Sequence, residues 1–249
     1  MDEKQKYYLQ IADNALILSH RLSEYSSYGP FLEEDLANTN VALDLLGIAE
    51  SILEEAATFE GKGKTGDDLA YRRGEQEFYN SLLVEQPNTD FAFIMVRQFL
   101  TDAFHFYFFS ELIKSKDTFL AAVAMKSLKE ITYHLRRSSE WMIRLGTGTE
   151  EANQKTQKAI DTLWKYSQEF MLESEVDKKM LKLGIGVNLA DVKTSWMEKV
   201  REIIYMSHLK IPTNEFQLNG GKEGRHTEFL GHILTEMQFL PSKYPDAKW

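Results

Sequence analysis

Apolar residues recur with the 3.6-residue period of an amphipathic helix along most of the chain. No stretch alternates apolar and polar residues with the period of two that a half-buried strand requires. The five prolines fall at the ends of the periodic segments, where proline is tolerated. The pattern predicts an all-α protein, with helices over about 4–25, 31–59, 68–83, 88–114, 117–146, 149–170, 190–209 and 227–240.

Long helices are the main feature of this pattern. Those over about 31–59, 88–114 and 117–146 would each be about 40 Å long, and with the helix over about 4–25 they have the dimensions of a four-helix bundle. The segment 31–59 has a wide apolar stripe, formed by Leu36, Val41, Leu43, Leu45, Leu46, Ile48, Ile52 and Leu53. We expect a single domain over residues 1–249, with a core bundle over about 4–146 and additional helices over about 149–240 packed on its outside.

Composition and charge exclude several classes of protein. The chain has 249 residues, a formal net charge of −9 and no cysteine. The negative charge disfavours nucleic-acid binding, which needs a basic surface, and the absence of cysteine excludes disulfides and thiolate metal sites. The N-terminal sequence lacks the apolar segment of a signal peptide, and no later run of 18 residues is free of charge. We therefore expect a cytoplasmic protein that does not span a membrane.

Three of the long predicted helices carry acidic or histidine side chains within their apolar surfaces. These residues are Asp44, Asp102, His105, Glu130 and His134. Asp102 and His105 are three residues apart and therefore lie on one face of their helix. A buried polar group left unpaired costs roughly 1–3 kcal/mol, so we expect the five residues to meet in a buried polar network.

A di-iron site is the functional alternative for these residues. Such sites in helical bundles take one Glu from each of two helices and a Glu-x-x-His pair from each of the other two. Only Asp102 and His105 approach this spacing on a long helix, segment 31–59 has no histidine, and Tyr133 stands three residues after Glu130. We interpret the five residues as a degenerate metal site that holds no metal and supplies no catalytic residue.

Nine segments, spread over the whole chain, carry a family resemblance. They are Asp13–Glu24, Leu32–Asn38, Ala42–Gly47, Leu83–Asn88, Lys129–Arg136, Arg144–Thr149, Gly220–Lys222, His226–Gly231 and Glu236–Gln238. They resemble, in the same order, the structural C subunits of the bacterial phenylacetyl-CoA epoxidases, which act in aerobic phenylacetate degradation. The resemblance implies a ferritin-like fold.

The same resemblance implies the role of the chain. It would be a non-catalytic, structural subunit that pairs with a homologous catalytic subunit, and that partner would hold the di-iron centre. Other subunits would include a reductase, and phenylacetyl-CoA would bind at or near the shared interface. Candidate contacts to coenzyme A in this chain are Glu33, Glu34, Asp35 and Lys222. Two alternatives stay open: a free-standing di-iron oxygenase with an atypical site, and a ferritin-like binding protein.

The outer segments are rich in aromatic and methionine side chains, which are enriched at interfaces. They include Trp164, Phe170, Met171, Trp196, Tyr205, Met206, Phe216, Phe229, Met237 and Phe239. We expect part of this surface to receive the catalytic subunit and to allow a homodimer of the isolated chain. Packing of these segments back onto the bundle is the competing expectation.

Overall fold

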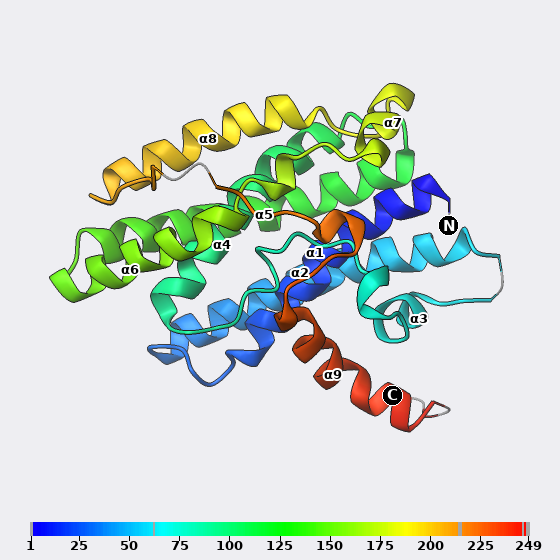
Figure 1. The fold of residues 1–249 in the computed structure, drawn as a ribbon, viewed down its shortest axis with the longest axis horizontal. Coiled ribbons are helices and arrows are strands. Elements are labelled where there is room, and N and C mark those ends of the chain that lie inside the picture. The colour runs from blue at the N-terminus through cyan, green and yellow to red at the C-terminus, as the bar shows by residue number, and fades with distance from the viewer. Residues whose placement is uncertain (1, 62, 214–215, 246, 248–249) are drawn as a thin grey trace. The chain divides into compact units, whose positions relative to one another are not determined.

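The computed structural model describes residues 2–61, 63–213, 216–245 and 247, and these residues form helices, turns and loops without a β-strand. Their contacts divide the chain into two compact units (Figure 1). The first unit consists of Met1–Pro87 together with Gly220–Trp249, and the second consists of Asn88–Asn219. The second unit is therefore inserted into the sequence of the first.

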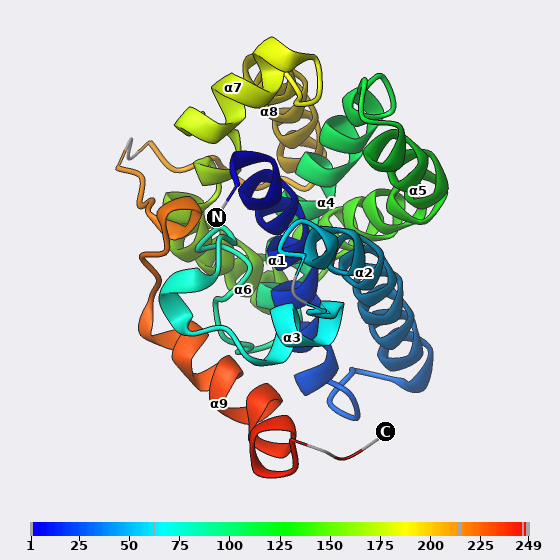
Figure 2. The same ribbon diagram turned by 90° about the vertical axis from the view of Figure 1, so that its right-hand side faces the viewer.

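The first unit is built on an antiparallel pair of long helices. Its elements are α1 (Glu3–Glu24), α2 (Leu32–Thr58), α3 (Gly66–Tyr71), the 3₁₀ turns η1 (Glu75–Glu77) and η4 (Gly221–Glu223), and α9 (Glu228–Lys243). Asp35 closes the turn between α1 and α2, because its Oδ1 accepts hydrogen bonds from the backbone N–H groups of Ser27 and Gly29. α9 packs against α1 and α3 (Figure 2). Both ends of the sequence thus contribute to this unit.

The second unit is built around α4, which is buried along most of its length. Its elements are α4 (Phe91–Leu112), α5 (Thr118–Gly146), α6 (Glu150–Leu163), the 3₁₀ turns η2 (Trp164–Tyr166) and η3 (Glu169–Met171), α7 (Glu175–Leu183) and α8 (Leu189–Met206). α5, α6 and α8 each pack against α4. The side chains of Asp90, Asp117 and Thr149 cap α4, α5 and α6 by accepting from backbone N–H groups that have no helical partner.

Seven of the eight predicted helices are present, and the one predicted over 68–83 is wrong. α3 ends at Tyr71, and the segment that follows is irregular apart from η1. Its backbone N–H groups find acceptors in α1 instead of within a helix: Tyr79 donates to Asp13, and Ser81 donates to Asn14. The helix predicted over 149–170 continues beyond α6 only as 3₁₀ turns, and the short helix α7 was not predicted.

The two units do not follow the predicted division into a core over 4–146 and outer helices over 149–240. α9 packs on the first helix pair, whereas α6 and α8 pack on the second. The expectation of one domain over residues 1–249 stays a prediction.

α2 is the one helix in the described part of the chain that is long and apolar enough to cross a membrane. This is a statement about length and composition only, and the core helix of a soluble protein passes the same test. α2 packs along α1, and it buries Val41, Leu45, Ile52 and Ala56. The expectation that the chain spans no membrane stays a prediction.

The aromatic and methionine residues of the outer segments are divided between core and surface. Trp164, Phe170, Met171 and Trp196 are buried in the second unit, so this part of the set packs back onto the helices. By contrast, Tyr205, Met206, Phe216 and Phe239 are exposed. The predicted docking surface is therefore smaller than the sequence indicates.

Candidate functional site

Asp102 lies in a buried polar cluster formed by α4 and α5 in the second unit. Gln98 Nε2 donates a hydrogen bond of 2.6 Å to Asp102 Oδ1, and Ser138 Oγ lies 2.8 Å from Oδ2. Burial raises the pKa of the Asp102 carboxyl to about 6, although the charge of His134 and the two hydrogen bonds act in the opposite direction. This carboxyl therefore exchanges its proton close to neutral pH.

The Ser138 hydroxyl shows how that proton is accommodated. Its Oγ lies 2.8 Å from Asp102 Oδ2 and 2.9 Å from the backbone oxygen of His134, yet it has a single proton to donate. When Asp102 is ionised, Ser138 can serve only one of these acceptors. When Asp102 is protonated, it donates to Ser138 Oγ, and Ser138 then donates to the His134 carbonyl. The protonated form thus keeps both hydrogen bonds.

His105 and His134 are the two buried imidazoles of this cluster. Burial, and then the charge of His134, lower the pKa of His105 to about 3, so His105 is neutral at ordinary pH. In the described residues, His105 Nδ1 and Gln98 Oε1 are buried without a hydrogen-bond partner. A buried polar atom without any partner costs roughly 1–3 kcal/mol.

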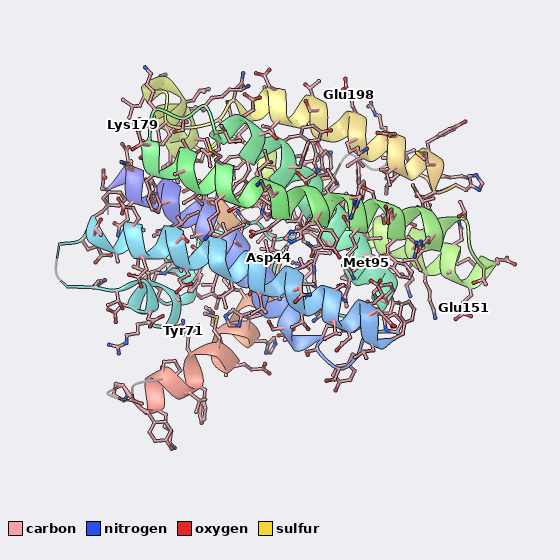
Figure 3. The ribbon with its side chains drawn as sticks, turned by 180° about the vertical axis from the view of Figure 1, so that it is seen from behind. Asp44, Tyr71, Met95, Glu151, Lys179 and Glu198 are labelled. Carbon is pink, nitrogen blue, oxygen red and sulfur yellow. The ribbon has the colours of Figure 1, made fainter. Side chains whose placement is uncertain are left out.

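The remaining predicted members of the network are Glu130 and Asp44. Glu130, one turn before His134 on α5, is only partly buried. Asp44 is a partly buried residue near the middle of α2, in the first unit (Figure 3). Arg137, which was not predicted, lies close enough to Asp102 to favour its ionised form. The full five-residue network stays a prediction.

The donor atoms of this cluster do not fit a di-iron centre. Both oxygens of Asp102 are engaged, one by Gln98 and one by Ser138. α2 contains no histidine, and the part of the chain that the structure describes contains no group of three or more acidic or histidine side chains placed to hold a metal ion. Di-iron bundles need paired acid–histidine ligands from two helices. We therefore derive no metal chemistry from these residues.

Asp102→Ala is expected to destabilise the second unit by about 1–3 kcal/mol, because it leaves Gln98 without its buried acceptor and Ser138 without its carboxyl partner. The cost should be larger at pH 5 than at pH 7.5. The folded pKa of about 6 lies above the ordinary value of 3.8. The stabilisation of the native state by this carboxyl is therefore greatest at low pH and declines as the pH rises toward 6.

Urea unfolding of the variant and the unmodified chain at both pH values measures this difference. Glu140→Ala, at an exposed position of α5, is the control and should leave the free energy of unfolding unchanged at both pH values. Equal costs of Asp102→Ala at the two pH values would contradict the raised pKa.

A second polar network lies in the first unit and centres on a buried ion pair. Arg73 donates through both terminal nitrogens to the Asp13 carboxylate, one of these bonds being 3.0 Å long, and Asp13 Oδ2 also accepts from the Tyr79 backbone at 2.9 Å. The Arg73 guanidinium also donates to the backbone oxygens of Leu69 and Glu77. Asp13 and Arg73 are both buried. The pair joins α1 to the irregular segment that follows α3.

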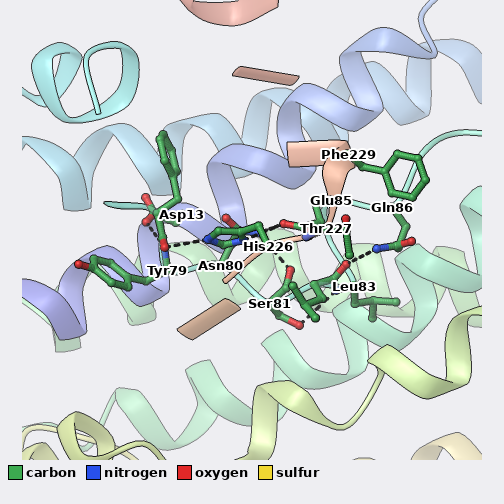
Figure 4. A network of polar contacts seen from close by, with 12 residues as sticks. Asp13, Tyr79, Asn80, Ser81, Leu83, Glu85, Gln86, His226, Thr227 and Phe229 are labelled. Atoms are coloured by element: carbon green, nitrogen blue, oxygen red, sulfur yellow. Dashed lines mark hydrogen bonds and ion pairs between the residues drawn. The ribbon is translucent and has the colours of Figure 1, made fainter. Parts of the chain in front are cut away.

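Glu85 and His226 form the other half of this network (Figure 4). His226 Nδ1 lies 2.9 Å from Glu85 Oε2, and its Nε2 lies 2.9 Å from the backbone oxygen of Phe78. Both neighbours are acceptors, so both ring nitrogens must donate and the imidazole is cationic. Burial alone would lower the pKa of His226, but the hydrogen bond and charge of Glu85 outweigh it and raise that pKa above its usual value. Glu85 further accepts from Asn80 and from the Thr227 backbone.

The C-terminal loop is positioned by close backbone contacts. A Cβ at Gly221 would collide with the backbone oxygen of Asn80, so only glycine allows this approach. Arg21 of α1 donates to the backbone oxygens of Glu85 and Phe229, and it pairs with Glu24 at 2.8 Å. The loop around Gly221 therefore packs against the irregular segment 72–86. The residues that lead into α9 are bound both to that irregular segment, through Thr227 and Glu85, and to α1, through Phe229 and Arg21.

The sequence did not reveal this network, although most of its members lie in segments that carry the family resemblance. Asp13, Glu85 and His226 belong to three of those segments, and Arg73 lies outside them. Charged residues that directly follow apolar ones, such as Asp13 after Ala12 and Glu85 after Val84, were the available signal. Their partners are 60 to 141 residues away, so local patterns could not pair them.

A pocket of about 530 Å³ opens on the first unit between α1, α3 and α9. Its lining combines an apolar side with the acidic residues Asp67, Asp68 and Glu236. Asp68 pairs with Arg72, and His20 presents a buried Nε2 that has no hydrogen-bond partner in the described residues. Burial lowers the pKa of His20, which keeps it neutral. Within the described residues, its acidic and histidine side chains do not come together as a group of three or more that could hold a metal ion, and we assign the pocket no catalytic role.

The candidate contacts to coenzyme A lie on different elements of the first unit. Glu33, Glu34 and Asp35 form the first turn of α2, where Asp35 is occupied in closing the preceding turn. Lys222 lies in η4, beside the glycine that approaches Asn80. Their contact with coenzyme A stays a prediction.

Comparison with known proteins places the whole chain in a family. All of residues 1–249 match the family described as phenylacetic acid catabolic protein. The chain belongs to this family. It is 42% identical over 249 residues, which is the whole length of both chains, to the C subunit of the 1,2-phenylacetyl-CoA epoxidase of Escherichia coli (strain K12). These findings confirm the resemblance given by the sequence segments and the all-α, ferritin-like fold class.

Proposed function

We propose that the chain is a structural, non-catalytic subunit of a 1,2-phenylacetyl-CoA epoxidase in phenylacetate degradation. The observation that carries this proposal is the likeness to the C subunit of that enzyme, which extends over every residue of both chains. The likeness therefore concerns the whole chain and not one shared segment. The place of that relative in its own complex is the natural guide to the role of this chain.

The donor set supports the assignment of catalysis to another subunit. Both oxygens of Asp102 are engaged, by Gln98 and by Ser138, and the described residues bring no group of three or more acidic or histidine side chains together to hold a metal ion. In this proposal a homologous catalytic subunit holds the di-iron centre, a reductase subunit supplies electrons, and phenylacetyl-CoA binds at or near the interface. The bound iron would supply oxygen activation there. The residues of this chain would support the partner and border its substrate entrance.

One purification tests the proposal. The tagged chain is isolated alone and from cells grown on phenylacetate, and both preparations are measured for iron and for turnover of phenylacetyl-CoA. We expect the cell-derived preparation to contain the other subunits, iron and activity, and the chain alone to contain neither stoichiometric iron nor activity. Two irons per chain after anaerobic reconstitution of the isolated protein, together with turnover, would favour a free-standing oxygenase instead. Failure to recover any other subunit would contradict the structural role.

A further inference from the structure

The outer face of α2 exposes a row of leucines. Leu32, Leu36 and Leu43 have 68%, 53% and 59% of their surface exposed. At about 100° per residue, these three side chains lie within an arc of about 40° on the helix. Tyr28 and Phe31, just before the helix, are also exposed and extend the apolar surface at its N-terminal end.

The same face becomes acidic toward the C-terminal end of the helix. Glu50 and Glu54 are exposed, and at about 100° per residue they lie on the same arc as the leucines. Within the described residues, neither forms an ion pair with a basic side chain of the chain. The 27 residues of α2 include no Lys or Arg, and their acidic residues are Glu33, Glu34, Asp35, Asp44, Glu50, Glu54 and Glu55. From Leu32 to Glu54 the stripe is about 33 Å long, at 1.5 Å per residue.

The charge of this face decides between possible occupants. A second copy of the chain placed parallel would bring Glu50 and Glu54 against themselves. Placed antiparallel, it would bury them against leucines. Either arrangement leaves carboxylates repelled or desolvated without partners. A membrane surface with anionic lipids would repel the same carboxylates. A helix with apolar residues at one end and basic residues at the other satisfies both halves of the stripe.

We propose that the outer face of α2, formed by Leu32, Leu36, Leu43, Glu50 and Glu54, is the docking surface for a helix of the catalytic subunit. That helix presents apolar side chains to the leucines and Lys or Arg side chains to Glu50 and Glu54. The leucines supply most of the apolar surface that the contact buries, and burial of apolar surface is the main favourable term in association. The glutamates set the direction of the partner helix and accelerate association. This inference rests on the proposed function and adds the surface and the chemistry of its partner.

Binding of the purified catalytic subunit to three double variants tests this surface. Leu36→Ala with Leu43→Ala should weaken binding by at least about tenfold. Glu50→Lys with Glu54→Lys should slow association several-fold at low salt, with a smaller effect at high salt. Leu181→Ala with Leu183→Ala removes exposed apolar side chains of α7, outside the outer aromatic and methionine set, and should change the affinity by no more than about twofold. All six positions are exposed, so melting temperatures close to that of the unmodified chain are expected and confirm folding.

Two results would overturn the inference separately from the proposed function. If the unmodified chain binds the catalytic subunit and the α2 variants bind equally well, the docking surface is wrong and the structural role stands. If sedimentation shows a homodimer of the unmodified chain that Leu36→Ala with Leu43→Ala dissociates, the occupant is a second copy. Failure of the unmodified chain to bind the catalytic subunit would contradict the proposed function and the surface together.

Discussion

Asp13→Asn is expected to destabilise the chain by about 3–5 kcal/mol, because it leaves the buried Arg73 guanidinium without its counter-charge. The substitution preserves the volume of the side chain and an acceptor for the Tyr79 backbone. Loss of the ion pair is therefore the main change. Chemical denaturation followed by circular dichroism measures the free energy of unfolding.

Two further variants separate the charge from the packing. Asp13→Asn combined with Arg73→Met removes both charges and should recover part of the loss, since the buried cation is gone. Lys155→Ala breaks an exposed ion pair with Glu151 on α6 and should leave stability unchanged. If Asp13→Asn is no more destabilising than Lys155→Ala, the buried pair does not stabilise the first unit.

Trp196→Ala should destabilise the second unit by a similar amount, about 3–5 kcal/mol, because it removes a fully buried indole and leaves a cavity. The indole Nε1 donates a 2.9 Å hydrogen bond to the backbone oxygen of Leu100. The ring also stacks on that of Trp164, with 6.0 Å between the ring centroids. Trp196→Phe keeps much of the packing and loses the hydrogen bond, so it should cost clearly less. Tyr205→Ala, at an exposed position of the same helix, is the control. A loss below about 1 kcal/mol for Trp196→Ala would show that the surrounding core collapses into the cavity.

The long helices were predictable because their apolar period continues over many turns and their lengths need no tertiary information. The segment after α3 was not, because its apolar residues resemble a helical pattern while its backbone is bound by Asp13 and Asn14, more than 60 residues earlier. α7 escaped prediction because nine residues give too short a periodic pattern. Local sequence therefore determined the elements whose hydrogen bonds are local.

The candidate sites divide in the same way. Asp102 and His105 stand out in the sequence because they interrupt an otherwise apolar helix, and the structure buries both. The pairing of Glu85 with His226 could not be read from spacing, because 141 residues separate the two side chains. The wide apolar stripe predicted over 31–59 already included Leu36 and Leu43, but its width did not show that these leucines remain exposed. Deciding this required the position of α1, which covers only the opposite part of the stripe.

The discontinuous first unit has a consequence for biosynthesis. Glu85 leaves the ribosome long before His226 and Thr227, the residues that neutralise and bind it in the finished protein. At about 5–20 residues per second, the delay is on the order of ten seconds. During this interval the inserted second unit can fold, while the emerging α1–α2 hairpin still lacks its C-terminal closure. A nascent chain stopped before residue 220 would therefore present an ordered insertion and an incomplete first unit, a state that proteases and chaperones would distinguish from the full-length protein.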